Sequence, residues 1–161
     1  MSPETSLSAY QDGLQMLARR ELSTAQLRAR LLDRDHNPED VDAAIAQLTE
    51  TGALDDARVA RAYAETALNV KGRGRLRIQR ELSEMGIDRE VAAAALADVF
   101  GEVDERGLIA NALRKKLRGG TKIDSPAEYA RVYQFLMRQG FSPAAVSAAL
   151  RAYRKQADPL E

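Results

Sequence analysis

The sequence predicts an all-α protein of three tandem three-helix repeats that form an elongated, curved helical stack. Its apolar residues recur at helical spacing, as Val41, Ile45 and Leu48 do at i, i+4 and i+7, and no strand-like alternation is present. Alanine, which has the highest helix propensity, is abundant in segments such as VDAAIAQL and EVAAAALADV. A segment that occurs three times along the chain indicates the repeat.

The repeated segment reads LLDRDHNPEDVDAAI from Leu31, LSEMGIDREVAAAAL from Leu82 and LMRQGFSPAAVSAAL from Leu136, and the copies align without gaps. In two copies a glycine, Gly86 or Gly140, follows the leucine by four residues, where the left-handed cap of a helix favours glycine. Residues that typically cap a helix N-terminus follow in all three copies: Asn37, Asp88 and Ser142. Each copy is therefore predicted to be a helix, a tight turn and a second helix.

Each pair of helices leaves room for one more helix before it, at about residues 8–20, 56–68 and 105–117. Pro38 and Pro143 follow two of the caps at the first helical position, where proline is favoured. Asp55 and Asp56 are predicted to cap and begin the first helix of the second unit. We predict three units, at residues 8–54, 55–100 and 105–153, with a loose Gly-rich stretch, RGGTKIDSPAE, inside the third.

Composition excludes several classes of protein. The 161 residues contain no cysteine, which excludes disulfides and cysteine zinc sites and is typical of a reducing, cytoplasmic compartment. No run approaches the ~18 apolar residues of a membrane span, and no secretory signal is visible at the N-terminus. Tryptophan is absent and aromatic residues make up only 5% of the chain, which disfavours large stacking platforms for single-stranded nucleic acid.

The charges are unevenly spread, although the formal net charge is zero. Residues 1–56 carry 5 basic and 11 acidic side chains, residues 57–100 carry 8 and 6, and residues 101–161 carry 11 and 7. A chain with this polarity can offer one face to an anion and another to a basic partner.

We predict no catalytic site, no cofactor and no metal site, because one histidine and no cysteine leave few nucleophilic or metal-binding combinations. His36 occupies the slot of Ile87 and Phe141 in the repeat, which indicates a partly buried turn residue rather than a ligand. The KGRGR stretch lacks the GK[ST] of a P-loop and follows a predicted helix rather than a strand, so neither nucleotide-binding motif is met. A hydrolase that uses paired carboxylates remains a remote alternative.

The segment KGRGRLRIQREL, residues 71–82, is the main candidate for a binding site. It concentrates five basic residues around two glycines, Gly72 and Gly74: Lys71, Arg73, Arg75, Arg77 and Arg80. Because the positive end of a helix macrodipole disfavours cations, their position near a predicted helix start indicates an anionic partner. The glycines would let the backbone approach that partner, and the N–H groups of the helix start could bind an anion.

A second basic cluster, LRKKLR, ends the first helix of the third unit and contains Arg114, Lys115, Lys116 and Arg118. Its apolar stripe is predicted to include Leu108, Ile109, Leu113 and Leu117. In a curved stack of repeats the two basic clusters could form one surface.

Three segments in this order resemble the RecX family of bacterial recombinase regulators: GALDDARVARAYAE at 52–65, KGRGRLRIQREL at 71–82 and MGIDREVAAAAL at 85–96. FLMRQGFSPAAVSAAL at 135–150 agrees as well, so the resemblance covers about residues 10–153. The chain departs from the family at Val59, where an aromatic is usual, at Thr66 and Asn69, where basic residues are common, and at Asp35–His36.

The resemblance implies a cytoplasmic protein of three three-helix repeats that binds the RecA filament in its groove, in homologous recombination, DNA repair and the SOS response. It further implies inhibition of ATP hydrolysis, strand exchange and coprotease activity, and a basic face that contacts DNA. The expected partners are thus the RecA filament and, weakly and without sequence preference, the DNA phosphate backbone. No membrane partner is expected, and the chain is expected to be a monomer.

Two hypotheses remain open from the residues alone: a non-enzymatic regulator of RecA–DNA filaments, and a DNA-binding module of helix-turn-helix type that acts without RecA. A recognition helix should end its unit and carry base-reading side chains. The last helices here, VDAAIAQL, EVAAAALADV and AAVSAALRAY, are rich in alanine instead. Together with the zero net charge, this favours the regulator.

Overall fold

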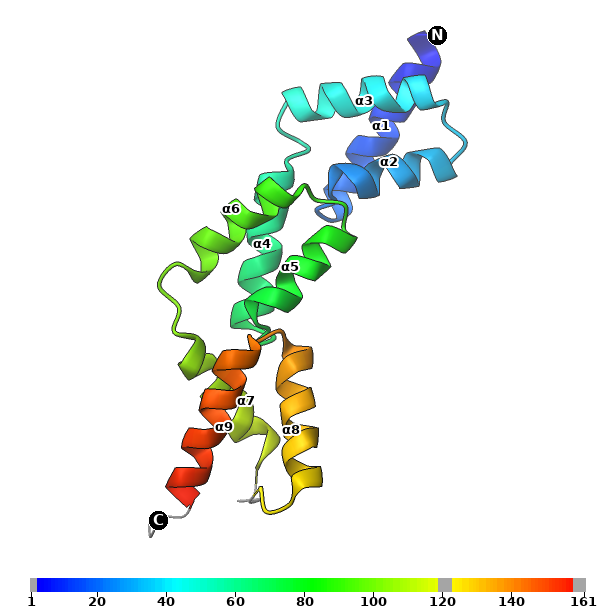
Figure 1. Cartoon of the computed structure of the whole chain (residues 1–161). Helices are drawn as coiled ribbons and strands as arrows, with labels where there is room; N and C mark the ends of the chain where they lie inside the picture. The colour runs from blue at the N-terminus through cyan, green and yellow to red at the C-terminus, as the bar shows by residue number, and fades with distance from the viewer. Residues whose placement is uncertain (1–2, 119–122, 158–161) are drawn as a thin grey trace. The chain divides into compact units, whose positions relative to one another are not determined.

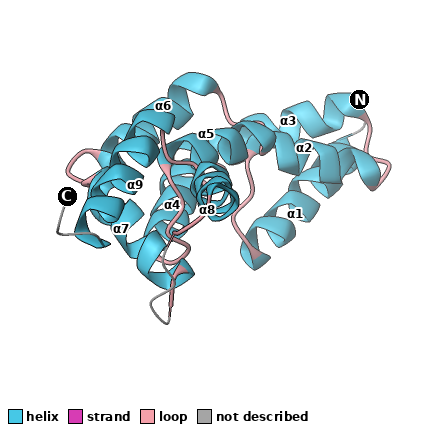
Figure 2. Ribbon diagram, turned by 60° about the horizontal axis from the view of Figure 1, so that its bottom comes forward, coloured by secondary structure: helices cyan, strands magenta, loops and turns pink. Residues whose placement is uncertain are grey.

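The computed structural model describes residues 3–118 and 123–157, and this part of the chain is all helical, as predicted (Figures 1 and 2). The helices are α1 (Pro3–Arg19), α2 (Thr24–Asp33), α3 (Pro38–Glu50), α4 (Asp56–Asn69), α5 (Arg75–Glu84), α6 (Arg89–Phe100), α7 (Glu105–Lys116), α8 (Pro126–Gln139) and α9 (Pro143–Ala157). None of the helices described is long and apolar enough to cross a membrane. The Gly-rich stretch predicted inside the third unit, residues 118–128, lies partly outside the described residues, and its last three residues form the start of α8.

The helices group into two compact units. One comprises the described part of residues 1–63 together with residues 81–95, and the other comprises residues 64–80 with the described part of 96–161. Helices α4, α5 and α6 therefore each contribute to both units. Both basic clusters lie in the second unit, although 33 positions separate Lys71 from Asp104, the residue before α7.

Helices α1, α2 and α3 pack around a core of leucine, valine and isoleucine side chains. The buried residues of this core are Leu22, Leu27, Leu31, Val41, Ile45, Leu48 and Leu54. Leu32, in contrast, is 40% exposed, because it lies on the other side of α2 from Leu27 and Leu31. Ser23 caps α2 in a reciprocal pair with Gln26, which fixes where the helix begins.

Helices α7, α8 and α9 build a second core of the same kind. Its buried residues are Ile109, Leu113, Val132, Leu136, Phe141, Val146 and Leu150. Phe141 occupies the repeat position of Ile87 and His36, and both apolar side chains are buried. The stripe predicted at i, i+4 and i+7, Val41, Ile45 and Leu48, is likewise buried, in the first core.

The turn inside each repeat has the backbone that its sequence predicts. Gly86 and Gly140 adopt φ of +77° and +102°, and Asp35, at the same position of the first repeat, adopts φ of +64°. The side chains of Asn37 and Ser142 accept the predicted capping hydrogen bonds from the backbone N–H groups of Glu39 and Ala145, at 3.1 and 3.4 Å. The local signals of the sequence therefore determine these helix ends.

Candidate partner-binding surface

The KGRGRLRIQREL segment, residues 71–82, forms most of the connection from α4 to α5 and the first eight residues of α5. Helix α4 ends at Asn69 and α5 begins at Arg75, so the basic residues do gather at a helix N-terminus. Lys71, Arg75 and Arg80 are exposed, whereas Arg73 and Arg77 are half-buried. Ile78 and Leu82 are fully buried and hold this helix in place.

The N-terminus of α5 meets the C-terminus of α8. The backbone N–H of Gly74 donates to the carbonyl of Gln139 at 2.7 Å, and that of Leu76 donates to the carbonyl of Gly140 at 3.1 Å. The Arg77 guanidinium donates to a third carbonyl of this helix end, that of Arg138, at 3.3 Å. Unpaired carbonyls at a helix C-terminus carry partial negative charge, so α8 stabilises the cations that begin α5.

This contact corrects part of the interpretation drawn from the sequence. Two N–H groups at the start of α5 are occupied by carbonyls of the same chain, so they are not available to bind an anion. The cations at this helix start have an internal negative partner in the end of α8. The side chains of this segment, of which Lys71, Arg75 and Arg80 are the most exposed, are therefore better placed to contact a partner than the helix terminus is.

The two glycines of the segment have different roles. A Cβ on Gly74 would lie 2.5 Å from the backbone carbon and oxygen of Gly140, so its close backbone approach is made inside the chain. The contact with Gly140 is therefore sufficient reason for a glycine at position 74, and approach to a partner by Gly74 stays a prediction. Gly72 adopts φ of +63° in open space, where it lets the chain turn between α4 and α5.

The second basic cluster does not point in one direction. The Lys116 ammonium lies over the ring of Phe135 on α8, 4.9 Å from the ring centroid, in a cation–π contact. Arg114, two residues earlier and thus about 200° around the helix axis, lines a groove between α7 and α9. Lys115 and Arg118 are exposed.

Helix α8 connects the two basic clusters. Phe135, which holds Lys116, and Arg138, whose carbonyl holds Arg77, are three residues apart and so lie on one face of α8. Arg131 precedes Phe135 by four residues on the same face, and the side chains of Arg131 and Arg138 are exposed. We refer to the following residues as the basic strip: Arg75, Arg77, Arg131, Arg138 and Lys116.

Sequence reasoning missed two members of the basic strip, Arg131 and Arg138. Each is a single cation on an amphipathic helix, and neither belongs to a cluster in the sequence. Their spacing of seven residues, with Phe135 between them, was the available signal, because it places all three on one side of a helix.

His36 is a structural residue of the turn between α2 and α3. Its Nε2 lies 2.6 Å from a carboxylate oxygen of Asp12 on α1, and its side chain is 12% exposed. A partly buried turn residue was predicted, whereas its partner Asp12 was not. Across residues 3–118 and 123–157, no three His, Cys, Asp or Glu side chains are grouped so that they could hold a metal ion.

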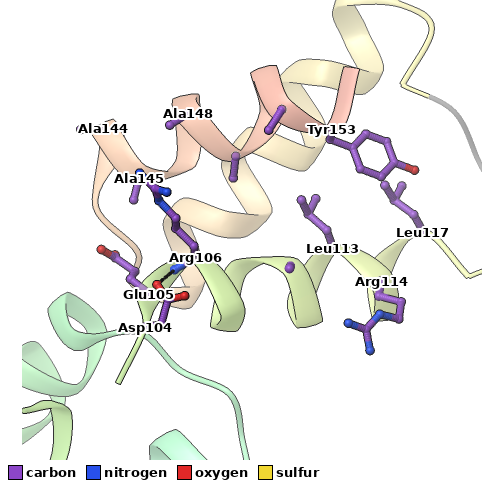
Figure 3. A pocket seen from close by; sticks show the side chains of 13 residues that line it. Asp104, Glu105, Arg106, Leu113, Arg114, Leu117, Ala144, Ala145, Ala148 and Tyr153 are labelled. Atoms are coloured by element: carbon purple, nitrogen blue, oxygen red, sulfur yellow. Dashed lines mark hydrogen bonds between the residues drawn. The ribbon is translucent and has the colours of Figure 1, made fainter. Parts of the chain in front are cut away.

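A groove of about 1040 Å³ lies between α7 and α9 (Figure 3). Its lining includes Arg106, Ala110, Leu113 and Arg114 from α7, and Ala148 and Tyr153 from α9. Arg106 extends from α7 toward Ala145 of α9, whereas Arg114 lies on the outer side of α7 (Figure 3). The groove, referred to below as the α7/α9 groove, is separate from the face of α8 that carries the basic strip.

Comparison with known proteins places all three repeats in one family. The models of the first, second and third three-helix domains of RecX match residues 9–48, 55–96 and 104–150. The regulatory protein RecX of Chromohalobacter salexigens is 34% identical over 131 residues, which cover 81% of this chain and 82% of that protein. The regulatory protein RecX of Xanthomonas oryzae pv. oryzae is 33% identical over 141 residues, covering 88% and 86%.

Solved structures show the same fold. The crystal structure of RecX from Lactobacillus salivarius superposes with a TM-score of 0.78 at 20% identity, covering 95% of this chain and 99% of that one. A crystal structure of regulatory protein RecX has a TM-score of 0.72 at 20% identity and covers 91% and 72%. By its sequence, this chain belongs to the RecX family of regulatory proteins.

Proposed function

We propose that this protein is a non-enzymatic regulator that binds the RecA–DNA filament and inhibits its ATP hydrolysis, strand exchange and coprotease activity in the cytoplasm. Membership of a family whose relatives are named regulatory proteins supports a regulatory role. The main structural support for a charged filament as the target is the basic strip. It joins both predicted basic clusters across α8 within one compact unit.

The basic strip is suited to a polyanionic surface. Arg75, Arg131 and Arg138 are exposed and come from two different helices, so their guanidinium groups can contact several phosphate or carboxylate groups at once. Arg77 and Lys116 are anchored by the Arg138 carbonyl and the Phe135 ring, which limits the side-chain freedom lost on binding. A DNA-filled protein filament presents both phosphates and acidic side chains to such a surface.

The alternative of an independent DNA-binding module fits less well. The third helix of each repeat, where a recognition helix would lie, is α3, α6 or α9, and all three are rich in alanine. A chain with zero net charge also gains little from counterion release on bare DNA. In a regulator of the RecA filament, the basic strip would add weak, salt-sensitive and sequence-independent contacts with phosphate to the contacts with protein.

DNA-dependent ATP hydrolysis by the RecA of the same organism tests the proposal. We expect strong inhibition when this protein is added at amounts well below those of RecA, because it would act on the assembled filament rather than by covering DNA. An absence of inhibition at equal amounts, together with salt-sensitive binding to bare DNA, would favour the independent DNA-binding module.

A further inference from the structure

The α7/α9 groove is a second concave surface, and the proposed function makes no use of it. Ala144, Ala148 and Ala152 follow one another at i, i+4 and i+8 along its α9 wall, which spans about 12 Å or two helical turns. On the α7 wall, Arg106, Ala110 and Arg114 have the same spacing, with Arg114 at the outer rim of the groove (Figure 3). The groove is therefore long enough to hold two turns of an additional helix between α7 and α9.

Apolar side chains make up the interior of the groove. Leu113 is buried, Leu117 and Tyr153 are half-buried, and Ala110 and Ala148 are exposed. The short alanine side chains leave about 1040 Å³ of open space beside these larger residues. An occupant must therefore bring its own large apolar side chains to exclude water from this surface.

The acidic and basic side chains at the groove differ in whether they can bind a partner. The carboxylate of Asp104 accepts the backbone N–H of Arg106 at 3.1 Å, and that of Glu105 accepts the backbone N–H of Ser142 at 3.0 Å and its hydroxyl at 3.4 Å. Arg106 and Arg114 are both exposed, and neither side chain has an ion pair or hydrogen bond with any residue in 3–118 or 123–157. The acidic groups are thus engaged within the chain, whereas the guanidinium groups can receive carboxylates from an occupant.

From this geometry we propose that the α7/α9 groove binds an acidic amphipathic helix of a partner protein. The helix would place a row of leucine-like side chains on the alanine wall and two carboxylates, two turns apart, against Arg106 and Arg114. A helix fits better than a strand, because the backbone groups of α7 and α9 are hydrogen-bonded within those helices and offer no edge for strand addition. Nucleic acid fits less well, because the apolar floor between Arg106 and Arg114 would be covered by the polar backbone of a nucleic acid rather than by apolar side chains.

Fluorescence anisotropy with synthetic helical peptides tests this proposal on the full chain. The probe is a fluorescein-labelled peptide with a leucine face flanked by glutamates two turns apart. One comparison peptide carries lysine in place of each glutamate, and another has the same composition with the leucine face scrambled. We expect the glutamate peptide to bind the native protein at least about tenfold more tightly than either comparison peptide.

Two variants locate the binding site. The double substitution Arg106→Glu with Arg114→Glu should weaken binding of the glutamate peptide about tenfold or more and strengthen binding of the lysine peptide. Ala148→Phe should block the groove and weaken both. Arg30→Glu with Arg89→Glu changes the net charge equally at two exposed arginines of the other compact unit, and should leave binding unchanged. Circular dichroism checks that each variant keeps its helices.

Three results would overturn the proposal. The first is that the glutamate peptide binds the native protein no better than the scrambled one. The second is that the native protein self-associates in sedimentation and Ala148→Phe abolishes the association, which would make a second copy the occupant. The third is that the Arg106→Glu/Arg114→Glu variant binds a labelled single-stranded oligonucleotide more weakly than the native protein does, while its affinity for each peptide is unchanged. None of these results depends on RecA, so they are distinguishable from failure of the proposed function.

Discussion

At the scale of single residues, the contact between Gly74 and Gly140 fixes how α5 meets α8. Both are buried, and a Cβ on either would lie 2.5 Å from backbone atoms of the opposite segment. Gly140 is also needed for its backbone conformation, because residues with a Cβ rarely adopt a φ of +102°. The absence of a side chain at these two positions is therefore what allows the carbonyls of α8 to reach the N–H groups of α5.

Gly74→Ala should lower the free energy of unfolding by about 1–3 kcal/mol, because backbone atoms cannot move away from the new methyl group. Gly107→Ala is the control. Gly107 is exposed within α7, and its nearest neighbour would lie 3.9 Å away, so we expect a gain of about 0.5 kcal/mol. Urea unfolding followed by circular dichroism measures both. Equal stability of the two variants would show that the Gly74–Gly140 contact contributes nothing.

Asp35→Gly should raise the free energy of unfolding by about 0.5–1 kcal/mol, because Asp35 holds φ of +64° where the other repeats have glycine. The same chemical change at Asp33, the last residue of α2, should have the opposite sign, since glycine is unfavourable in a helix. Thermal unfolding of the two variants compares them directly. A loss of stability in Asp35→Gly would mean that this aspartate makes a contact that offsets its strained backbone.

At the scale of elements, the sequence predicted what depends on neighbours along the chain. The first helices of the second and third repeats end within one residue of their predicted bounds, because capping residues and glycine act locally. The docking of α8 on α5 was not predictable, since it joins Gly74 to Gln139 through backbone groups that every residue has. The same is true of Asp12, which pairs with His36 over 24 positions.

Leu82→Ala and Leu136→Ala should each lower the free energy of unfolding by about 2–5 kcal/mol, because both side chains are fully buried in their cores. Leu32→Ala should change it by no more than about 0.5 kcal/mol, since that side chain is 40% exposed although it also lies in the repeated segment. Chemical denaturation separates the two classes. A small effect at Leu82 or Leu136 would show that repeat position does not determine packing.

At the scale of the whole molecule, the candidate site was predicted in part. The basic residues of the α4–α5 connection were identified from their density, but Arg131 and Arg138 became visible only when α8 was placed beside them. Conversely, Arg114 and Lys116 are neighbours in the sequence and lie on different sides of α7. Charge density along a chain thus identifies a candidate segment, whereas the helix faces decide which charges share a surface.

The central claim is that the basic strip acts on the RecA–DNA filament, and inhibition of RecA ATP hydrolysis by charge-reversed variants tests it most directly. Arg75→Glu with Arg138→Glu removes one predicted and one newly found member of the strip, both exposed. Arg30→Glu with Arg89→Glu changes the net charge equally in the other compact unit. We expect the strip variant, with its helical circular dichroism intact, to lose inhibition, and the control variant to inhibit like the native protein. Full inhibition by the folded strip variant would contradict the account.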